Sequence, residues 1–375
     1  MPFRGTTVDE TRREFVALAR QEGGNRRDLC RRFGISPTTG YQWLARAAAG
    51  GMDAVVCRSR RPHQSPGQTS SAIEDELLAL RDAHPTWGAR KLRAVLQARH
   101  LAAPATSTIT TILHRHNRID ADHPQTTPWQ RFEHDAPNAL WQLDFMGHRP
   151  LRSGRVHPLT VIDDHSRFGL VLTACAHERG DLVRTHLTAC FEQYGLPQAI
   201  LADNGPPWGS SFRGAITQMD VWLIRLGIDP IHGRPKHPET QGKIERWHRT
   251  IAADVFALRQ FTDCPEIQDA FDHFRQTYNH DRPHDAIQLQ PPVTRYQVSP
   301  RTFPSVLPAP TYDDGDDLRK VRSKGEVHFA GRRHFVGGGL VGEWVGIRPT
   351  TTDGLYQVRF CHRDIGEIDL RSPAE

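Results

Sequence analysis

The sequence predicts a multidomain protein with an all-α N-terminal part, a central α/β core built on a mixed sheet, and a small all-β C-terminal domain. A chain of 375 residues is too long for one hydrophobic core. The first third carries capping signals and the apolar period of short helices. Strand patterns begin only after Pro137, and the segment 321–370 is rich in glycine and alternates with a period of two.

Composition argues against a membrane protein and against a disulfide scaffold. The chain is 37% hydrophobic and has no apolar run near the ~20 residues that span a bilayer, and its start lacks the apolar stretch of a signal peptide. We therefore expect a cytoplasmic protein. The six cysteines include no CxxC pair, which predicts buried thiols rather than disulfides or a thiolate zinc site.

Charge is distributed unevenly along the chain. Residues 1–128 hold 19 Lys and Arg against 12 Asp and Glu, although the whole chain carries a net charge of only +5. A basic segment is what a polyanionic partner such as nucleic acid requires, because neutralised phosphates release counterions. An ordinary solvated surface is the alternative.

Residues 1–50 predict a helix-turn-helix. Thr7 to Glu10 form a capping box, and Asn25 can cap a second helix. Gly34 suits a left-handed turn, and Ser36 and Pro37 suit the N-cap and first position of a third helix. A bare three-helix bundle is the alternative. In a DNA-binding motif the third helix would present short polar and cationic side chains to base edges and phosphates, namely Thr38, Thr39, Gln42 and Arg46.

Two linkers and a second helical group are expected next. Residues 51–70 are rich in Gly, Pro, Ser and Arg, which is typical of a linker. Its arginines could lie in a minor groove of DNA or remain solvated: Arg58, Arg60 and Arg61. Residues 71–118 predict a second helix-turn-helix, with a capping box at Ser71 to Glu74 and a third helix from Ser107. Residues 119–136 predict another linker.

The central core is expected over residues 137–260. Three strands, a helix and a fourth short strand are predicted in the order Leu140–Gly147, Val156–Ile162, Phe168–Ala174, Asp181–Tyr194 and Ala199–Ala202. A meander followed by alternating helices and strands indicates mixed strand directions. A helical extension at 261–300, ending in Pro291 and Pro292, and a small β-barrel or sandwich at 310–372 complete the prediction.

Three acidic residues lie at positions where a carboxylate would destabilise the fold, so each is expected to have a function. Asp144 interrupts an apolar strand, Asp203 ends another, and Glu245 lies in a helix predicted to start near Thr240. In an open sheet such strand ends face the functional crevice. Three converging carboxylates would hold one or two magnesium ions, which activate the attacking oxygen and stabilise the leaving oxygen of a phosphodiester displacement.

These residues carry a family resemblance. WQLDF around Asp144, ADNG around Asp203 and HPETQGKIERWHRT around Glu245 resemble the DDE transposases and retroviral-type integrases of the RNase H-like superfamily. The segment Tyr278–His284 is similar to the YNxxRPH element of bacterial insertion-sequence transposases. The resemblance covers roughly 137–300. The histidine-cysteine zinc module of retroviral integrases is absent from the sequence, which favours the insertion-sequence branch.

The resemblance implies an activity and its partners. It implies an RNase H-like core with catalytic Asp144, Asp203 and Glu245 as ligands of two magnesium (or manganese) ions. Water would free a 3′ hydroxyl at each element end, and that hydroxyl would attack a target phosphodiester. The expected partners are double-stranded DNA, as terminal repeats and as target, and further copies of the chain in a homo-oligomer on DNA. The expected location is the bacterial cytoplasm, associated with the nucleoid.

Two glutamates compete for the third position of the triad. The gap of 35 residues from Asp203 to Glu239 is the one by which the family is often named, whereas 41 residues separate Asp203 from Glu245. The PxxQGxxE pattern places the acid three residues after Gly242. This local pattern favours Glu245.

Other charged residues near these acids have ordinary explanations too. Asp163 and Asp164 follow the second strand and are interpreted as turn formers outside the triad. His280 and His284 have metal-ligand spacing, but Pro283 disfavours a helix between them and hence a zinc site. Three cations lie around Glu245 and would bind DNA phosphates, namely Lys243, Arg246 and Arg249. The alternative is that they only form surface ion pairs.

Two other functions remain open at this point. A DNA-binding regulator without catalysis is disfavoured because all three acids are present. A metal-dependent nuclease that cuts without joining differs from a transposase only in strand transfer, so a joining assay separates the two.

Overall fold

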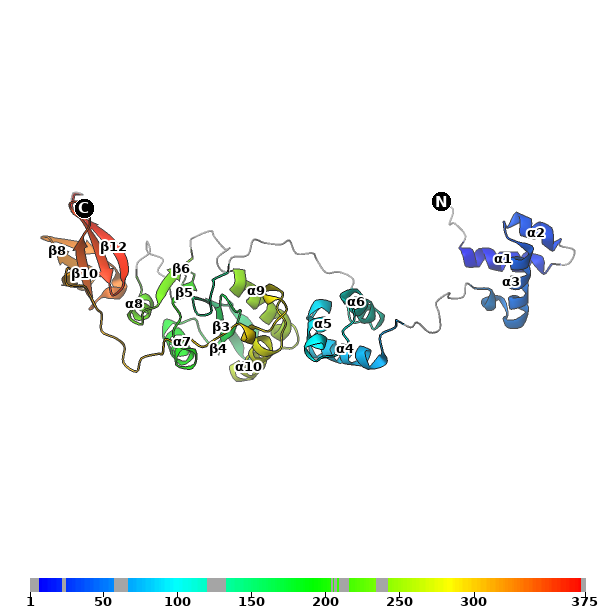
Figure 1. Cartoon of the computed structure of the whole chain (residues 1–375), viewed down its shortest axis with the longest axis horizontal. Coiled ribbons are helices and arrows are strands. Elements are labelled where there is room, and N and C mark those ends of the chain that lie inside the picture. Colours follow the sequence, from blue (N-terminus) through cyan, green and yellow to red (C-terminus); the bar gives the residue numbers. More distant parts are fainter. Residues whose placement is uncertain are drawn as a thin grey trace. The chain divides into compact units, whose positions relative to one another are not determined.

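The computed structural model describes residues 7–21, 25–56, 67–119, 133–203, 205, 208, 216–233 and 242–371. They form two compact units, Met1–Gln68 and Thr69–Glu375 (Figure 1). No helix in these ranges combines the length and apolar character needed to cross a bilayer. The thiols of Cys30, Cys175 and Cys190 are buried, as expected, whereas those of Cys264 and Cys361 are only half-buried, and Cys57 lies outside the described residues.

The first unit is the predicted three-helix arrangement. Its helices are α1 (Val8–Ala19), α2 (Arg26–Arg32) and α3 (Pro37–Gly50), followed by a 3-10 turn, Met52–Val55. The capping box at Thr7 and Glu10 and the Asn25 cap are both present. Gly34 has a φ of +64°, and the Ser36 side chain accepts from Thr39 N, so the expected turn between α2 and α3 is confirmed.

A second three-helix group opens the larger unit. It consists of α4 (Ser71–Ala83), α5 (Ala89–Ala98) and α6 (Thr106–Arg115), around Leu77, Leu92 and Leu113. The capping box predicted at Ser71 is wrong. Ser70 is the N-cap and makes no side-chain bond, so Ile73 rather than Glu74 takes the third helical position, and Glu74 pairs with Arg115 of α6.

The central sheet has mixed strand directions, as predicted. Its strands are β1 (Leu140–Phe145), β2 (Arg149–Leu151), β3 (Gly154–Asp163), β4 (Gly169–Cys175), β5 (Ala199–Ala202) and β6 (Asp229–His232). The order is β2-β3-β1-β5-β6, with β4 on β3. The pairs β1–β3 and β3–β4 are antiparallel, whereas β1–β5 and β5–β6 are parallel.

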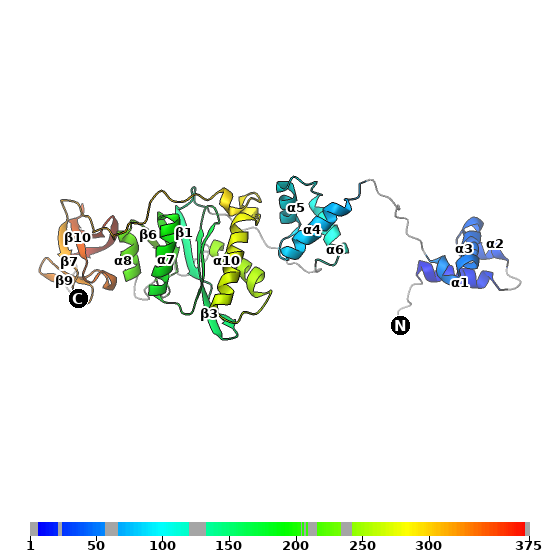
Figure 2. The ribbon, with the colours of Figure 1, turned by 90° about the horizontal axis from the view of Figure 1, so that it is seen from below.

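Helices cover both faces of this sheet (Figure 2). On one face α7 (Gly180–Tyr194) and α8 (Gln218–Arg225) pack on alternate β1 residues such as Trp141 and Leu143. On the other face α9 (Gly242–Ile251) and α10 (Cys264–His280) pack on Ile162 and Leu172. A Cβ on Gly169 of β4 would lie 2.6 Å from the Trp247 ring, so α9 depends on a glycine there to approach the sheet.

The chain after α9 is less helical than predicted. A π-helical turn, Ala252–Phe256, precedes α10, and the predicted extension to residue 300 is wrong beyond His280. Only two short 3-10 turns follow, Asp285–Ile287 and Pro292–Thr294. Pro283 explains the stop, because a proline lacks the N–H that a helix needs and restricts the preceding residue.

The C-terminal domain is all-β, as predicted, but it is not a closed barrel. Its strands are β7 (Asp317–Lys320), β8 (Glu326–Phe329), β9 (Arg332–Phe335), β10 (Trp344–Pro349), β11 (Leu355–Phe360) and β12 (Arg363–Asp369). A four-stranded sheet of order β12-β11-β10-β7 and a β8-β9 hairpin remain separate among the described residues. Val345 and Phe360 share a hydrophobic core with Val221 and Ile224 of α8, and Phe329 of the hairpin packs on Tyr356 of the four-stranded sheet.

Candidate active site

Two of the three predicted acids lie side by side at one edge of the sheet. Gln142 of β1 pairs with Leu201 of β5 in parallel register, and continuing that register by two residues brings Asp144 beside Asp203. Both carboxylates are half-buried. Because parallel strands end at the same edge, the local sequence of each strand suffices to bring these acids together.

The third acid belongs to α9, on the face of the sheet opposite α7. Glu245 is exposed in the first turn of that helix, whereas Ile244 and Trp247 on either side are buried against the sheet. The competing Glu239 lies outside the described residues.

The acids influence one another electrostatically. Burial raises the pKa of Asp144 to about 7, and the negative charge of Asp203 is the next cause. Glu178 and Glu245 raise the same pKa further. Glu178 was not predicted as part of the site, since no motif marks it. It follows β4 and lies 2.8 Å from Nδ1 of His157.

Asp144 is also supported from the opposite strand and from α9. Thr160 of β3 faces it in the antiparallel register and donates from Oγ1 to the Asp144 carbonyl over 2.7 Å. Nε2 of His248 lies 2.8 Å from the same Oγ1, and its Nδ1 lies 4.0 Å from Asp144 Oδ2. Burial, and then the charge of Arg149, lowers the pKa of His248 to about 4. The imidazole is therefore neutral at pH 7, and its contact with Asp144 is not an ion pair.

Asp203 is fixed by its own loop. Its Oδ1 accepts from the Gly205 N–H over 3.0 Å and from the indole N–H of Trp208 over 2.5 Å. Across the described ranges no group of three or more His, Cys, Asp or Glu side chains is arranged to hold a metal ion. Asp144 and Asp203 thus share an edge of the sheet and the charge of Glu245 reaches Asp144, but the three acids do not form a closed ligand cluster.

The start of α9 is fastened by buried polar groups. Asp164 accepts from Gln142 Nε2 over 2.9 Å and pairs with Lys243, and Gln142 Oε1 accepts from the Ile244 N–H over 3.1 Å. The turn-forming role is confirmed for Asp163, whose Oδ1 accepts from Ser166 N. It is wrong for Asp164, because this side chain bonds to other elements instead of its own turn.

The predicted DNA-contacting side chains differ in exposure. Lys243 is half-buried in its pair with Asp164, whereas Arg246 and Arg249 are exposed and take part in no ion pair among the described residues. On α3, Thr38 and Gln42 are exposed, Arg46 is half-buried, and Thr39 Oγ1 lies 2.9 Å from Ser36 Oγ. The three linker arginines, Arg58, Arg60 and Arg61, lie outside the described residues.

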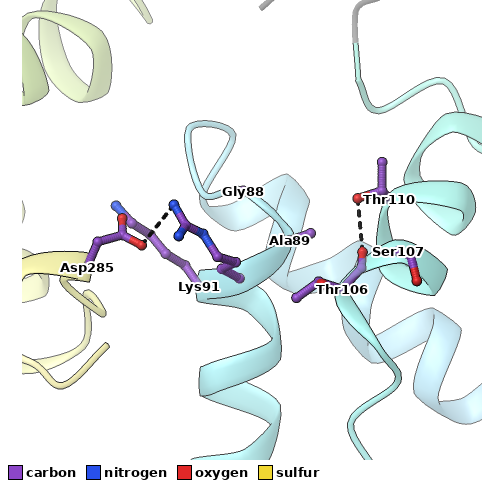
Figure 3. Close-up of a pocket in the computed structure, with 8 residues that line it drawn as sticks. Gly88, Ala89, Lys91, Thr106, Ser107, Thr110 and Asp285 are labelled. Atoms are coloured by element: carbon purple, nitrogen blue, oxygen red, sulfur yellow. Dashed lines mark hydrogen bonds and ion pairs between the residues drawn. The ribbon is translucent and has the colours of Figure 1, made fainter. Parts of the chain in front are cut away.

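A separate cationic pocket of about 480 Å³ lies where α5 and α6 begin (Figure 3). Neither helix has a side-chain cap, and Arg90 pairs with Asp285 across the pocket at 3.2 Å. Burial, and then the charge of Arg282, lowers the pKa of the neighbouring Lys91 to about 8. Hydroxyls complete the lining, from Thr106, Ser107 and Thr110.

Comparison with known families gives a consistent result along the chain. Residues 134–238 and 226–292 match integrase core domains, and residues 316–375 match the IS481 family transposase C-terminal domain. Residues 11–63 match a helix-turn-helix domain, and residues 39–113 match a homeodomain-like domain.

Individual relatives are more distant. An uncharacterized 39.2 kDa protein of insertion element IS476 from Xanthomonas euvesicatoria is 26% identical over 234 residues, which cover 61% of this chain and 65% of that protein. An uncharacterized 31.7 kDa protein of insertion element IS407 from Burkholderia multivorans is 26% identical over 157 residues, covering 42% and 54%. The chain therefore spans less than two thirds of the length of these relatives.

Among solved structures, the HTLV-2 integrase catalytic core domain in complex with magnesium is 16% identical, with a TM-score of 0.32, over 44% of this chain and 99% of that one. This similarity is weak, whereas the family matches follow one another in order along the sequence. An N-terminal helix-turn-helix, a central integrase core and an IS481-type C-terminal domain identify the chain as a member of the insertion-sequence transposases with a retroviral-integrase-like core.

Proposed function

We propose that this chain is a polynucleotidyl transferase that cuts DNA at the ends of an insertion element and joins them to target DNA. In the first step water attacks a phosphodiester, and the 3′ oxygen leaves with a proton. In the second step that 3′ hydroxyl attacks a target phosphodiester and loses its proton, and the target's own 3′ oxygen leaves and takes up a proton as a new 3′ hydroxyl. The observation that carries the proposal is the placement of Asp144 beside Asp203, with Glu245 close enough to raise the pKa of Asp144.

The donor set suits a hard divalent cation. Asp144, Asp203 and Glu245 offer only carboxylate oxygens, which magnesium and manganese prefer. Their mutual repulsion is what a bound cation would relieve. We propose that these three residues hold two such ions, which when bound polarise the phosphodiester and stabilise the departing oxygen. Asp144 and Asp203 supply the fixed part of the site from the sheet, and exposed Glu245 supplies the part that can adjust.

DNA binding is assigned to the helical modules and to the cations of α9. Thr38, Thr39, Gln42 and Arg46 would contact an element end, together with the linker arginines Arg58, Arg60 and Arg61. Exposed Arg246 and Arg249, next to the acids, would hold the phosphates that react, with Lys243 anchoring their helix. Joining both ends at once requires a homo-oligomer on DNA.

A joining assay tests the proposal. The full chain is incubated with magnesium, target plasmid and duplexes that carry the precut terminal repeats of its own element. Joined products are expected for the parent. Asp144→Asn should bind the duplexes as the parent does but join them at least ~100-fold more slowly, since a lost metal ligand removes several kcal/mol of transition-state stabilisation. Cutting without joining would identify a nuclease, and binding without either reaction a regulator.

A further inference from the structure

Trp208 holds one oxygen of a proposed metal ligand. This indole is only 3% exposed, and its N–H donates to Oδ1 of Asp203 over 2.5 Å. The Gly205 N–H donates to the same oxygen over 3.0 Å. Among the hydrogen bonds of the described residues, none reaches Oδ2. The two oxygens of Asp203 are therefore held unequally.

Trp208 is itself held by β1 and by the N-cap of α8. Its ring stacks on Phe145 with centroids 5.2 Å apart and an interplanar angle of 11°. Phe145 directly follows Asp144 on β1. The Trp208 carbonyl accepts from the hydroxyl of Thr217, the N-cap of α8, over 3.2 Å. Trp208 thus connects the strand of Asp144 to the carboxylate of Asp203.

Space on the other side of the carboxylate is limited. A Cβ built on Gly205 would lie 3.0 Å from Oδ2 of Asp203 and 3.4 Å from Oδ1. A larger residue at 205 would require the carboxylate to move by a few tenths of an ångström. The N–H groups of Gly205 and Trp208, both directed at Oδ1, therefore favour one orientation of Asp203.

We propose that Trp208 is a positioning residue that orients Asp203, with Oδ1 fixed by the indole N–H and Oδ2 left free to bind a divalent cation. The proposal rests on the function proposed above. An N–H that donates to a ligating carboxylate sets its direction before the metal arrives, and loss of such a partner typically weakens metal binding about 10–100-fold. Stacking on Phe145 keeps the donor in place.

The test compares Trp208→Phe with the parent for Mn²⁺ binding, measured by electron paramagnetic resonance on the full chain. Phenylalanine keeps an aromatic ring against Phe145 but lacks the N–H. The dissociation constant for Mn²⁺ should rise about tenfold. Trp222→Phe is the matched control, because Trp222 is also buried in this core and packs on Phe191 and Arg184. It should bind Mn²⁺ as the parent does.

A Trp208→Phe variant with parental Mn²⁺ affinity would overturn the proposal while leaving the proposed function intact. If Asp144→Asn loses Mn²⁺ binding while Trp208→Phe and Trp222→Phe both keep it, the role of Trp208 is refuted and the metal site stands. A parent that binds no Mn²⁺ would instead count against both the metal site and the role of Trp208.

A second measurement does not depend on the folding of the Trp208 variant. The eight tryptophans give eight indole N–H signals in a spectrum of ¹⁵N-tryptophan-labelled protein. In Asp203→Asn, one indole signal should shift strongly upfield as its charge-assisted bond is lost, and the same signal should move when Mg²⁺ is added to the parent. Eight signals that are insensitive to Asp203→Asn would overturn the proposal.

Discussion

The Thr160 hydroxyl donates to the backbone carbonyl of Asp144 over 2.7 Å, across the antiparallel β1–β3 pair. The same oxygen lies 2.8 Å from His248 Nε2, so the neutral imidazole donates to it. A fully buried hydroxyl thereby joins β1, β3 and α9 behind the acids.

Thr160→Val should destabilise the fold although it conserves shape. The valine leaves the His248 N–H without its partner in a buried site, which costs about 1–3 kcal/mol of unfolding free energy. Urea denaturation measures this difference. Thr173→Val, at a half-buried position of neighbouring β4, is the control and should change stability by less than about 0.5 kcal/mol. Equal losses of unfolding free energy at both positions would mean that the hydrogen bonds of Thr160 do not stabilise the fold.

Local signals predicted much of the fold and some of the site. The Asn25 cap, the Gly34 turn and the β5 strand depend on a few adjacent residues, and each lies where it was expected. The edge strand β2 has only three residues, too few for a periodic pattern.

The missed parts of the site depend on tertiary contacts. His248, Trp208 and Glu178 reach the acids from three different elements, and no short pattern records that convergence. The same reason explains why Asp164 was misinterpreted. Its partner Lys243 lies 79 residues away along the chain.

Substitutions that keep the shape of the side chain but remove its charge can decide which of the two glutamates belongs to the triad. Glu245→Gln removes a carboxylate whose charge reaches Asp144, so it should lower joining at least ~100-fold. Glu239→Gln should retain most activity. The joining assay with precut ends measures both, and duplex binding provides the control for folding. A strong loss in Glu239→Gln with parental activity in Glu245→Gln would show that the 35-residue spacing was the better guide.

Arg46 and Gln42 of α3 should affect DNA binding differently. If Arg46 meets a phosphate, Arg46→Ala should weaken binding to an element end and lower the slope of log affinity against log salt by about one. Gln42→Ala removes no charge, so it should lower affinity for the correct sequence while leaving the slope unchanged. Fluorescence anisotropy at several salt concentrations measures both quantities. A parental slope in Arg46→Ala would exclude the phosphate contact.

Lys91 should make stability depend on pH in the alkaline range. Its pKa of about 8 in the folded chain is below the value of about 10.4 expected when unfolded, so between these limits the unfolded chain binds more protons. Below pH 8 this group therefore lowers the free energy of unfolding by a constant amount. Between pH 8 and about 10 the free energy of unfolding rises by up to ~1.4 kcal/mol per pH unit, until the penalty is gone. Lys91→Met removes the titrating group, so its stability advantage over the parent should shrink across this range.

Urea denaturation of both proteins at pH 7, 8, 9 and 10 measures the Lys91 effect. Arg90→Met is the matched control, because it removes a neighbouring cation of the same pocket that stays protonated throughout. Its difference from the parent should stay constant with pH. Parallel stability curves for Lys91→Met and the parent would show that burial does not lower the pKa of Lys91.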